Sequence, residues 1–289
     1  MARPYLGNPK YTIEVLQKYH FVFQKRFGQN FLIDEHVLEK IIESSGITKD
    51  DFILEIGPGI GTMTQYLAEA AREVAAVEID SSLIPILKDT LKDWDNVSVI
   101  NNDILKTDIK KIADEKNGGK PVKVVANLPY YITTPIIMGL FEKNVPVDSI
   151  TVMVQKEAAD RLAAAPGTRA SSAISCAVSY YATSKLMFTA APGSFYPAPK
   201  VTSAVVRMDI RTTPAVQVED EDGYFALIRA AFGQRRKTAA NAIASGLSLP
   251  KENVIHAIEA AGFDARIRPE ALTLEDFAAI QQALKAANA

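Results

Sequence analysis

Four consecutive residues, Asn127, Leu128, Pro129 and Tyr130, have the groups needed to activate an amine on a flat ring. An exocyclic adenine amine is a poor nucleophile because its lone pair is delocalised into the ring. Acceptors on both of its hydrogens, here the Asn127 side-chain oxygen and the Leu128 backbone carbonyl, favour a pyramidal nitrogen with a localised lone pair. Pro129 stiffens the turn by fixing φ, and Tyr130 can stack on the base. These groups fit chemistry on an amine of an aromatic base, and the alternative interpretation is an N-cap asparagine followed by a proline in a loop.

A second aromatic ring is needed to hold such a base between two flat faces. Phe195, in the segment 194–201 (SFYPAPKV), is the best candidate, and Tyr196 is its competitor. The two prolines of this segment hold the backbone extended. Either ring could equally belong to the protein core, so the choice between them stays open at this point.

A glycine-rich loop, residues 55–61 (EIGPGIG), follows an apolar run typical of a buried strand. Glycines such as Gly57 and Gly59 let the backbone turn tightly and approach a ligand closely. Their G-x-G-x-G spacing differs from the G-x-G-x-x-G of dinucleotide-binding proteins, and no G-K-[ST] follows as in a triphosphate P-loop. Such turns occur in many α/β folds, so the loop alone is weak evidence for a ligand.

Two acidic residues, Glu78 and Asp103, end the next two predicted strands. A carboxylate at the first position can accept hydrogen bonds from both ribose hydroxyls, and one at the second can accept from an adenine amine. Ligands of open α/β sheets bind at the carboxyl ends of the strands, where both residues would lie. Either could instead be an ordinary surface or turn residue. With the glycine loop, they predict an adenosyl cofactor without phosphates, for which S-adenosyl-L-methionine is the natural candidate.

These side chains require a scaffold, and the sequence predicts an α/β fold. Strands alternating with helices imply a parallel sheet covered on both faces. Strands are predicted at 52–57, 73–79, 97–101, 122–127, 149–155, 185–190 and 201–210, and helices at 62–71, 82–92 and 134–143.

The character of the chain changes after about residue 212. In the last predicted helix Phe277, Ile280 and Leu284 share one face, and Thr273 with Asp276 offers a capping box at its start. A polar linker is predicted at 212–223, followed by helices at 224–232, 235–245, 251–261 and 274–286. We therefore expect an N-terminal extension at 1–22, an α/β domain at 23–212 and a small all-helical domain at 213–289.

The composition of the chain excludes several kinds of site and partner. The chain has 289 residues, of which 48% are hydrophobic, enough for a sizeable core. A single cysteine, Cys176, excludes a disulfide framework and a cysteine-based zinc site. The three histidines show no ligand spacing, so no metal is predicted. With a net charge of −2, any nucleic-acid partner must be held by a local basic patch.

Targeting signals are not visible in the sequence. The first thirty residues contain no apolar stretch of the kind found in secretory signals. The longest uncharged run, 124–141, contains Asn127, Pro129 and Pro135, which are unsuited to a membrane helix. We expect a cytoplasmic protein without a membrane partner.

A local basic patch is available in the C-terminal part. Arg235, Arg236 and Lys237 are predicted at the start of a helix, where three cations could hold phosphates. Basic residues at 25–26 and 266–268 could extend the path. The alternative is a solvated charge run without a ligand.

Taken together, these motifs resemble the ribosomal RNA adenine N6,N6-dimethyltransferases of the small subunit. The resemblance runs from about Lys25 to Phe277. It rests on 26–32 (RFGQNFL), 55–61 (EIGPGIG), Glu78, Asp103, 127–130 (NLPY), 155–157 (QKE), 195–201 (FYPAPKV) and 234–238 (QRRKT).

The resemblance implies a fold and a set of roles. The fold would be the Rossmann-like seven-stranded sheet of S-adenosylmethionine-dependent methyltransferases, with its last strand antiparallel, followed by a small helical rRNA-recognition domain. The implied cofactor residues are Asn30, Leu32, Gly57 and Gly59 near the methionine part or pocket wall, Glu78 on the ribose, Asp103 on the adenine, and Asn127 touching both cofactor and target amine.

The implied reaction is N6,N6-dimethylation of two adjacent adenosines near the 3′ end of 16S rRNA, with S-adenosyl-L-homocysteine as the other product. The substrate would be the small ribosomal subunit or its assembly intermediate, and the enzyme, a monomer, would contribute to ribosome biogenesis. The slightly acidic net charge fits recognition of an assembled particle better than of naked RNA.

Three other functions share part of this pattern. A large-subunit adenine methyltransferase of the erythromycin-resistance type shares several motifs, but 27–31 (FGQNF) and 234–238 (QRRKT) favour the small-subunit reading. A non-catalytic RNA- or transcription-factor-like binding module on the same fold is disfavoured by the intact glycine loop and NLPY. A Rossmann dehydrogenase is disfavoured by the glycine spacing.

Overall fold

The computed structural model describes residues 5–24, 28–141, 145–234 and 236–287. It divides into two compact units, one of residues 1–159 and 185–210 and the other of residues 160–184 and 211–289. Residues 160–184 group with the C-terminal helices although they precede the predicted linker at 212–223. Its division into domains at 22 and 212 stays a prediction.

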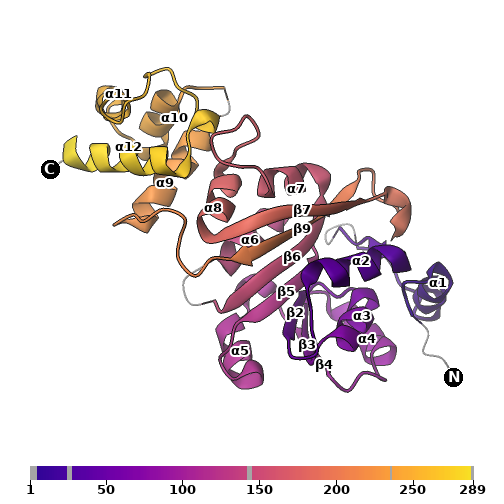
Figure 1. Cartoon of the computed structure of the whole chain (residues 1–289). Coiled ribbons are helices and arrows are strands. Elements are labelled where there is room, and N and C mark those ends of the chain that lie inside the picture. The colour runs from indigo at the N-terminus through magenta and orange to yellow at the C-terminus, as the bar shows by residue number, and fades with distance from the viewer. Residues whose placement is uncertain (1–4, 25–27, 142–144, 235, 288–289) are drawn as a thin grey trace. The chain divides into compact units, whose positions relative to one another are not determined.

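The first unit is built on a seven-stranded sheet, whose strand order is β4-β3-β2-β5-β6-β9-β7 (Figure 1). Strands β2 to β6 pair in parallel, and β9 pairs antiparallel with β6. The predicted Rossmann-like sheet with an antiparallel last strand is confirmed. The strands are Phe52–Ile56 (β2), Glu73–Glu78 (β3), Val97–Asn101 (β4), Val122–Asn127 (β5), Val147–Gln155 (β6), Ala182–Ala190 (β7) and Ser203–Ile210 (β9).

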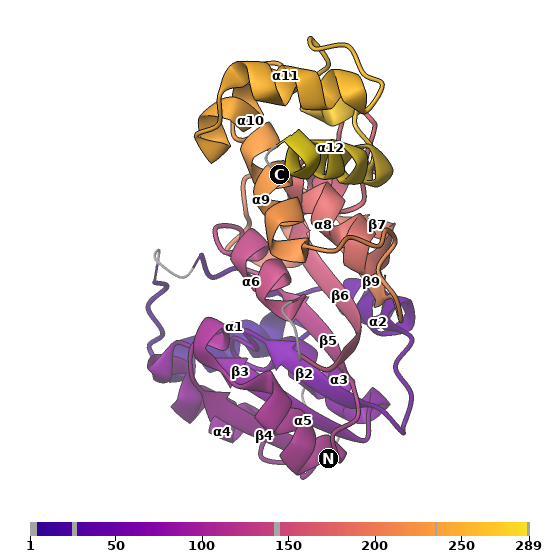
Figure 2. The same cartoon turned by 90° about the vertical axis from the view of Figure 1, so that its left-hand side faces the viewer.

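Helices cover both faces of this sheet. Helices α2, α3 and α4 lie on one side of the strands in Figure 1, and α5 and α6 lie on the other, in front of the strands in Figure 2. Strand side chains such as Ile53, Val74 and Val125 pack with α2 and α3. Every residue of β2 is buried, as expected for a parallel strand covered on both faces. The helices are Glu35–Ser45 (α2), Thr62–Ala70 (α3), Ile84–Thr90 (α4), Ile109–Asn117 (α5), Thr133–Leu140 (α6) and Lys156–Leu162 (α7).

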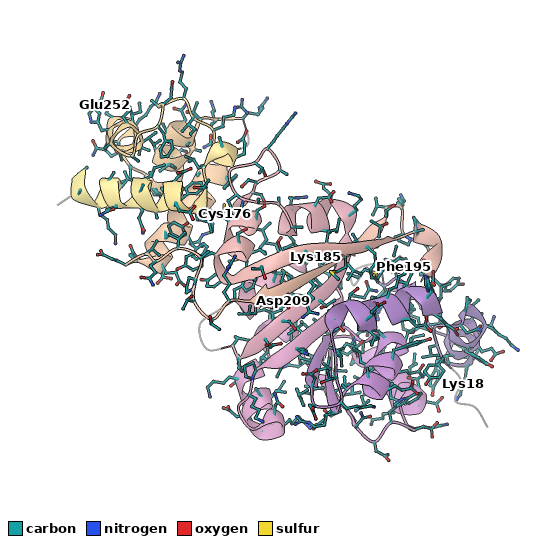
Figure 3. All side chains as sticks on the ribbon, in the orientation of Figure 1. Lys18, Cys176, Lys185, Phe195, Asp209 and Glu252 are labelled. Carbon is teal, nitrogen blue, oxygen red and sulfur yellow. The ribbon has the colours of Figure 1, made fainter. Side chains whose placement is uncertain are left out.

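The N-terminal segment packs on this unit through helix α1, Pro9–Lys18. Leu6 and Leu16 are buried in a cluster with side chains of α4. The Leu6 N–H donates to Gln65 Oε1 at 2.9 Å, and Lys18, labelled in Figure 3, pairs with Asp89 at 2.5 Å. The segment therefore contributes to the core of the first unit.

The second unit is helical. Cys176, labelled in Figure 3, is buried on α8. The predicted apolar face of the last helix is confirmed, because Phe277, Ile280 and Leu284 are all buried. So is its capping box: the Thr273 N–H donates to Asp276 Oδ2 at 2.8 Å, and the Asp276 N–H donates to Thr273 Oγ1 at 3.2 Å. The helices are Ala173–Tyr181 (α8), Glu221–Phe232 (α9), Ala239–Leu247 (α10), Lys251–Ala260 (α11) and Leu274–Ala287 (α12).

Two predicted helix starts are wrong, and side-chain caps explain both. Helix α9 begins at Glu221 rather than 224, because Asp220 accepts a hydrogen bond from the Gly223 N–H at 2.9 Å. Helix α10 begins at Ala239 rather than 235, because Thr238 is its N-cap. The basic run at 235–237 therefore precedes the helix instead of opening it.

The described helices include none that is long and apolar enough to cross a membrane.

The turn between β2 and α3 requires glycine at two positions, for different reasons. Gly57 and Gly59 have φ angles of 70° and 63°, in the left-handed region. A Cβ atom on Gly59 would lie 2.9 Å from the Phe31 ring, whereas one on Gly57 would meet nothing within 4 Å. Both glycines are needed for the backbone conformation, and Gly59 is also needed for packing.

We predict that Gly59→Ala destabilises the protein more than Gly57→Ala. Each change forces an L-residue into a left-handed conformation, at a cost of roughly 1–2 kcal/mol, and only Gly59→Ala also displaces Phe31. Urea unfolding gives both free energies of unfolding. Equal losses in the two variants would contradict the packing argument.

Candidate functional site

A cleft opens at the carboxyl ends of the central strands. The Asn30 side chain lies at its wall beside strand β1 (Phe31–Leu32), the glycine turn and Glu78 lie at the ends of β2 and β3, and Asn127 ends β5. The cleft brings together every predicted catalytic and cofactor residue except Asp103, namely Asn30, Leu32, Gly57, Gly59, Glu78, Asn127, Leu128, Pro129, Tyr130 and Phe195.

Glu78 is buried at the edge of the cleft with both carboxylate oxygens engaged. Oε1 accepts from the Asp80 N–H at 2.8 Å and Oε2 from the Gly59 N–H at 3.1 Å. Burial raises the pKa of Glu78 to about 7, although these two backbone donors act in the opposite direction. Each oxygen can accept more than one hydrogen bond, so the fixed carboxylate can still receive hydroxyl groups of a ligand.

Glu55, the first residue of the glycine-loop motif, also lines the cleft, although the sequence predicted no role for it. Its side chain is wholly buried, and burial raises its pKa to about 8. The Thr64 hydroxyl acts in the opposite direction, and the nearby Glu78 carboxylate adds to the increase. Within the described part of the chain, neither Glu55 Oε2 nor Thr62 Oγ1 has a hydrogen-bond partner. Buried polar atoms are rarely left unpaired, which points to a polar ligand group at this end of the cleft. A glutamate inside the apolar strand 52–56 is the sequence signal that could have found it.

The Asn127 amide is oriented by the segment across the cleft. Its Nδ2 donates to the Asn30 backbone carbonyl at 3.3 Å. Because the nitrogen is engaged there, the Oδ1 atom is left to accept a hydrogen bond. The next residue is also fixed, since the Leu128 N–H donates to the Met153 carbonyl of β6 at 3.0 Å.

The two aromatic rings predicted to hold the base belong to separate elements. The Tyr130 hydroxyl lies 2.8 Å from Ser203 Oγ on β9, which fixes the ring. Phe195, labelled in Figure 3, belongs to strand β8 (Phe195–Tyr196), which pairs antiparallel with β1 and sets Phe195 opposite Leu32. Phe195 is 3% exposed and lines the cleft, whereas its competitor Tyr196 is 40% exposed and does not.

Asp103 lies outside the lining of the cleft. It caps the short 3₁₀ turn Ile104–Lys106 (η3), where its Oδ1 accepts from the Leu105 N–H at 3.0 Å. Lys106 Nζ lies 3.9 Å from the other oxygen. These local contacts account for the position of the carboxylate, and its predicted hydrogen bond to an adenine stays a prediction.

The predicted RNA-binding residues belong to the second unit. Arg236 and Lys237 are exposed in the turn before α10. Arg235 lies outside the described residues, as do Lys25 and Arg26. The Ala239 N–H donates to the Ile267 carbonyl at 2.8 Å, so this turn lies beside the segment 266–268. Arg266 and Arg268 there pair with Asp264 and Glu270, whereas no ion pair to a described residue involves Arg236 or Lys237.

Comparison with known proteins decides the family. A model of the ribosomal RNA adenine dimethylase family matches residues 20–282 of the chain. The protein belongs to the ribosomal RNA adenine dimethylases. A ribosomal RNA small subunit methyltransferase A from Lachnoclostridium phytofermentans is 63% identical to this dimethylase over 277 residues, covering 95% of this chain and 96% of the relative.

Solved structures share the fold of this dimethylase. A dimethyladenosine transferase from Plasmodium falciparum superposes with a TM-score of 0.73 at 24% identity, covering 89% of this chain and 98% of that one. The 23S rRNA methyltransferase ErmE gives a TM-score of 0.67 at 24% identity, covering 89% of this chain and 100% of that one. At such identities the likeness extends to the fold alone.

We predict that Glu55 makes the dimethylase less stable as the pH rises. An unfolded glutamate titrates near pH 4.3, whereas the folded-state pKa of Glu55 is about 8. Between these values the folded protein binds more protons than the unfolded one, so the free energy of unfolding falls as pH increases. Glu55→Gln should remove this contribution and flatten the decline between pH 5 and pH 8.

Urea unfolding across this pH range tests the effect. Glu252→Gln, at an exposed position on α11, is the matched control and should follow the wild-type curve. A Glu55→Gln curve parallel to the wild type would contradict the assignment.

Proposed function

We propose that this protein is a ribosomal RNA adenine N6,N6-dimethyltransferase that uses S-adenosyl-L-methionine to methylate 16S rRNA. The observation that carries the proposal is the fixed Asn127 amide, whose free oxygen lies in the same cleft as the Glu78 carboxylate and the glycine turn. The small-subunit substrate is supported by the 63% identical relative, which is named for the small subunit. The large-subunit alternative has support from fold alone, at 24% identity.

The cleft has features that suit the cofactor. The left-handed turn leaves space at Gly57, where a Cβ would meet nothing within 4 Å. Glu78 would hold the ribose hydroxyls, and the unpartnered Glu55 Oε2 and Thr62 Oγ1 would face polar atoms of the methionine part. Asn30 and Leu32 would form the wall. When bound, the cofactor supplies an electrophilic methyl group on sulfonium sulfur.

The residues of the NLPY turn would prepare the target nitrogen. Asn127 Oδ1 and the Leu128 carbonyl accept the two hydrogens of the adenine amine, which localises its lone pair toward the methyl group. Tyr130 and Phe195 hold the base between their rings. Alignment of nitrogen and methyl carbon provides most of the acceleration. No strong base is required, because the nitrogen becomes acidic once methylated and releases its proton to water.

The finer identity of the substrate follows from the same proposal. We infer that the two targets are adjacent adenosines near the 3′ end of 16S rRNA, in the small ribosomal subunit or an assembly intermediate. The enzyme would act as a monomer in the cytoplasm, where ribosome assembly takes place. Arg235, Arg236 and Lys237 would hold phosphates, because the two described members are exposed and without acidic partners among the described residues.

Asn127→Ala tests the catalytic assignment. We expect methyl transfer to under-methylated small subunits to fall by at least about 10²-fold, the scale seen when one preorganised polar group is lost. Labelled methyl donor and mapping of the modified nucleotides provide the measurement. Tyr130→Phe is the comparison, since it keeps the ring that holds the base and loses only the contact with Ser203, and it should lose much less activity than Asn127→Ala.

Two outcomes would refute the proposal. Near-wild-type transfer by Asn127→Ala would remove the role of the amide. No methyl transfer from the wild type to under-methylated small subunits would remove the substrate assignment.

The basic run is tested through salt dependence. Each phosphate contact adds roughly 0.7–0.9 to the slope of log affinity against log salt. Changing Arg235, Arg236 and Lys237 together to Ala should therefore weaken binding to small subunits and lower the slope by about 2–3. Cofactor affinity is the control and should not change. An unaltered salt slope would show that the run is only a solvated surface.

A further inference from the structure

Two consecutive tyrosines, Tyr130 and Tyr131, follow Pro129. Their side chains lie in different halves of the cleft. Tyr130 is held by Ser203 on β9, to one side of β5. Tyr131 lies on the other side, toward β3 and β4. The evidence is that helix α6, which begins two residues after Tyr131, packs on the η3 turn headed by Asp103. The Asp103 and Glu78 carboxylates, at the ends of β4 and β3, also act on the Tyr131 hydroxyl, whose pKa is raised by burial first and then by these charges.

The Tyr131 ring lies at the mouth of the cleft and is not part of the core. Its side chain lines the cleft but is 60% exposed. Gly28, which has a φ of 58°, faces the ring: a Cβ there would lie 3.7 Å from Tyr131 Cδ1 and Cε1. The Tyr131 hydroxyl has no hydrogen-bond partner in the described part of the chain. A large, exposed aromatic ring beside a binding cleft is available to cover a ligand.

We infer that Tyr131 is a further cofactor-binding residue, whose ring covers the adenosyl end of bound S-adenosyl-L-methionine beside the ribose site at Glu78. The inference rests on the proposed function and extends it to a residue outside the predicted site. A flat ring suits the face of a purine or a ribose, and aromatic contacts of this kind do not need the phenol oxygen. The aromatic residues then have separate roles. Tyr130 and Phe195 enclose the target base, and Tyr131 encloses the cofactor.

Calorimetric titration with the cofactor, without RNA, tests this inference. Tyr131→Ala should weaken the affinity for S-adenosyl-L-methionine about tenfold or more, a loss typical of removing one aromatic stacking partner. The loss should be equal for S-adenosyl-L-homocysteine, because both ligands share the adenosyl group. Tyr131→Phe should bind within about threefold of the wild type, since the hydroxyl makes no hydrogen bond.

Two controls separate this contact from other effects. Tyr11→Ala removes a tyrosine that is 37% exposed on α1 and outside the cleft lining, and it should leave cofactor affinity unchanged. Binding of Tyr131→Ala to small subunits should also match the wild type. Equal thermal unfolding of the variants would confirm that the fold is intact.

The results that would contradict this inference differ from the result that would contradict the proposed function. If the wild type binds the cofactor and Tyr131→Ala binds it equally well, the inference fails while the proposed function stands. Unchanged cofactor affinity with weakened subunit binding would assign Tyr131 to RNA instead. A wild type that binds no cofactor would overturn the proposed function, and this inference with it.

Discussion

The hydrogen bond from Asn127 Nδ2 to the Asn30 carbonyl is the contact on which the rest of the site depends. An amide that rotated freely would offer its nitrogen as readily as its oxygen, and only the oxygen can accept from an amine. The Asn30 carbonyl is itself held in place. Strand β1 pairs with β8, the Ile33 N–H donates to the Ser194 carbonyl at 2.8 Å, and Gln29 Nε2 donates to Asp80 Oδ2 at 2.8 Å. One short segment, residues 29–33, therefore connects the NLPY turn to the side of the cleft that contains Glu78 and the glycine turn.

The same cleft contains two carboxyl groups that are buried from solvent. Glu55 and Glu78 have raised pKa values of about 8 and about 7 because burial disfavours their charged forms. Ionising them in the free protein costs stability, and donors brought by a ligand would offset that cost. Under the proposed function, the buried pair would link cofactor binding to protonation.

Much of the fold and of the candidate site could be predicted from the sequence, because parallel strands bring their carboxyl ends to one edge of the sheet. That rule alone places Gly57, Glu78 and Asn127 together, and the structure confirms that they line one cleft. Asp103 follows β4 at the same edge, but its carboxylate caps its own 3₁₀ turn and does not line the cleft, and such local competition is not visible in strand spacing. The exposure of Tyr131 depends on how the chain around Gly28 lies across the cleft, which is a tertiary property. Helix α5 was missed because its sequence, IKKIADEKN, is mostly polar.

The most direct test of the account is a crystal structure of the protein with S-adenosyl-L-homocysteine and an adenosine-containing RNA fragment. We predict that the adenine amine lies within hydrogen-bonding distance, about 2.7–3.2 Å, of both Asn127 Oδ1 and the Leu128 carbonyl. Asn127 Nδ2 should still donate to the Asn30 carbonyl. A base bound elsewhere, or an Asn127 amide that turns its nitrogen toward the base, would contradict it.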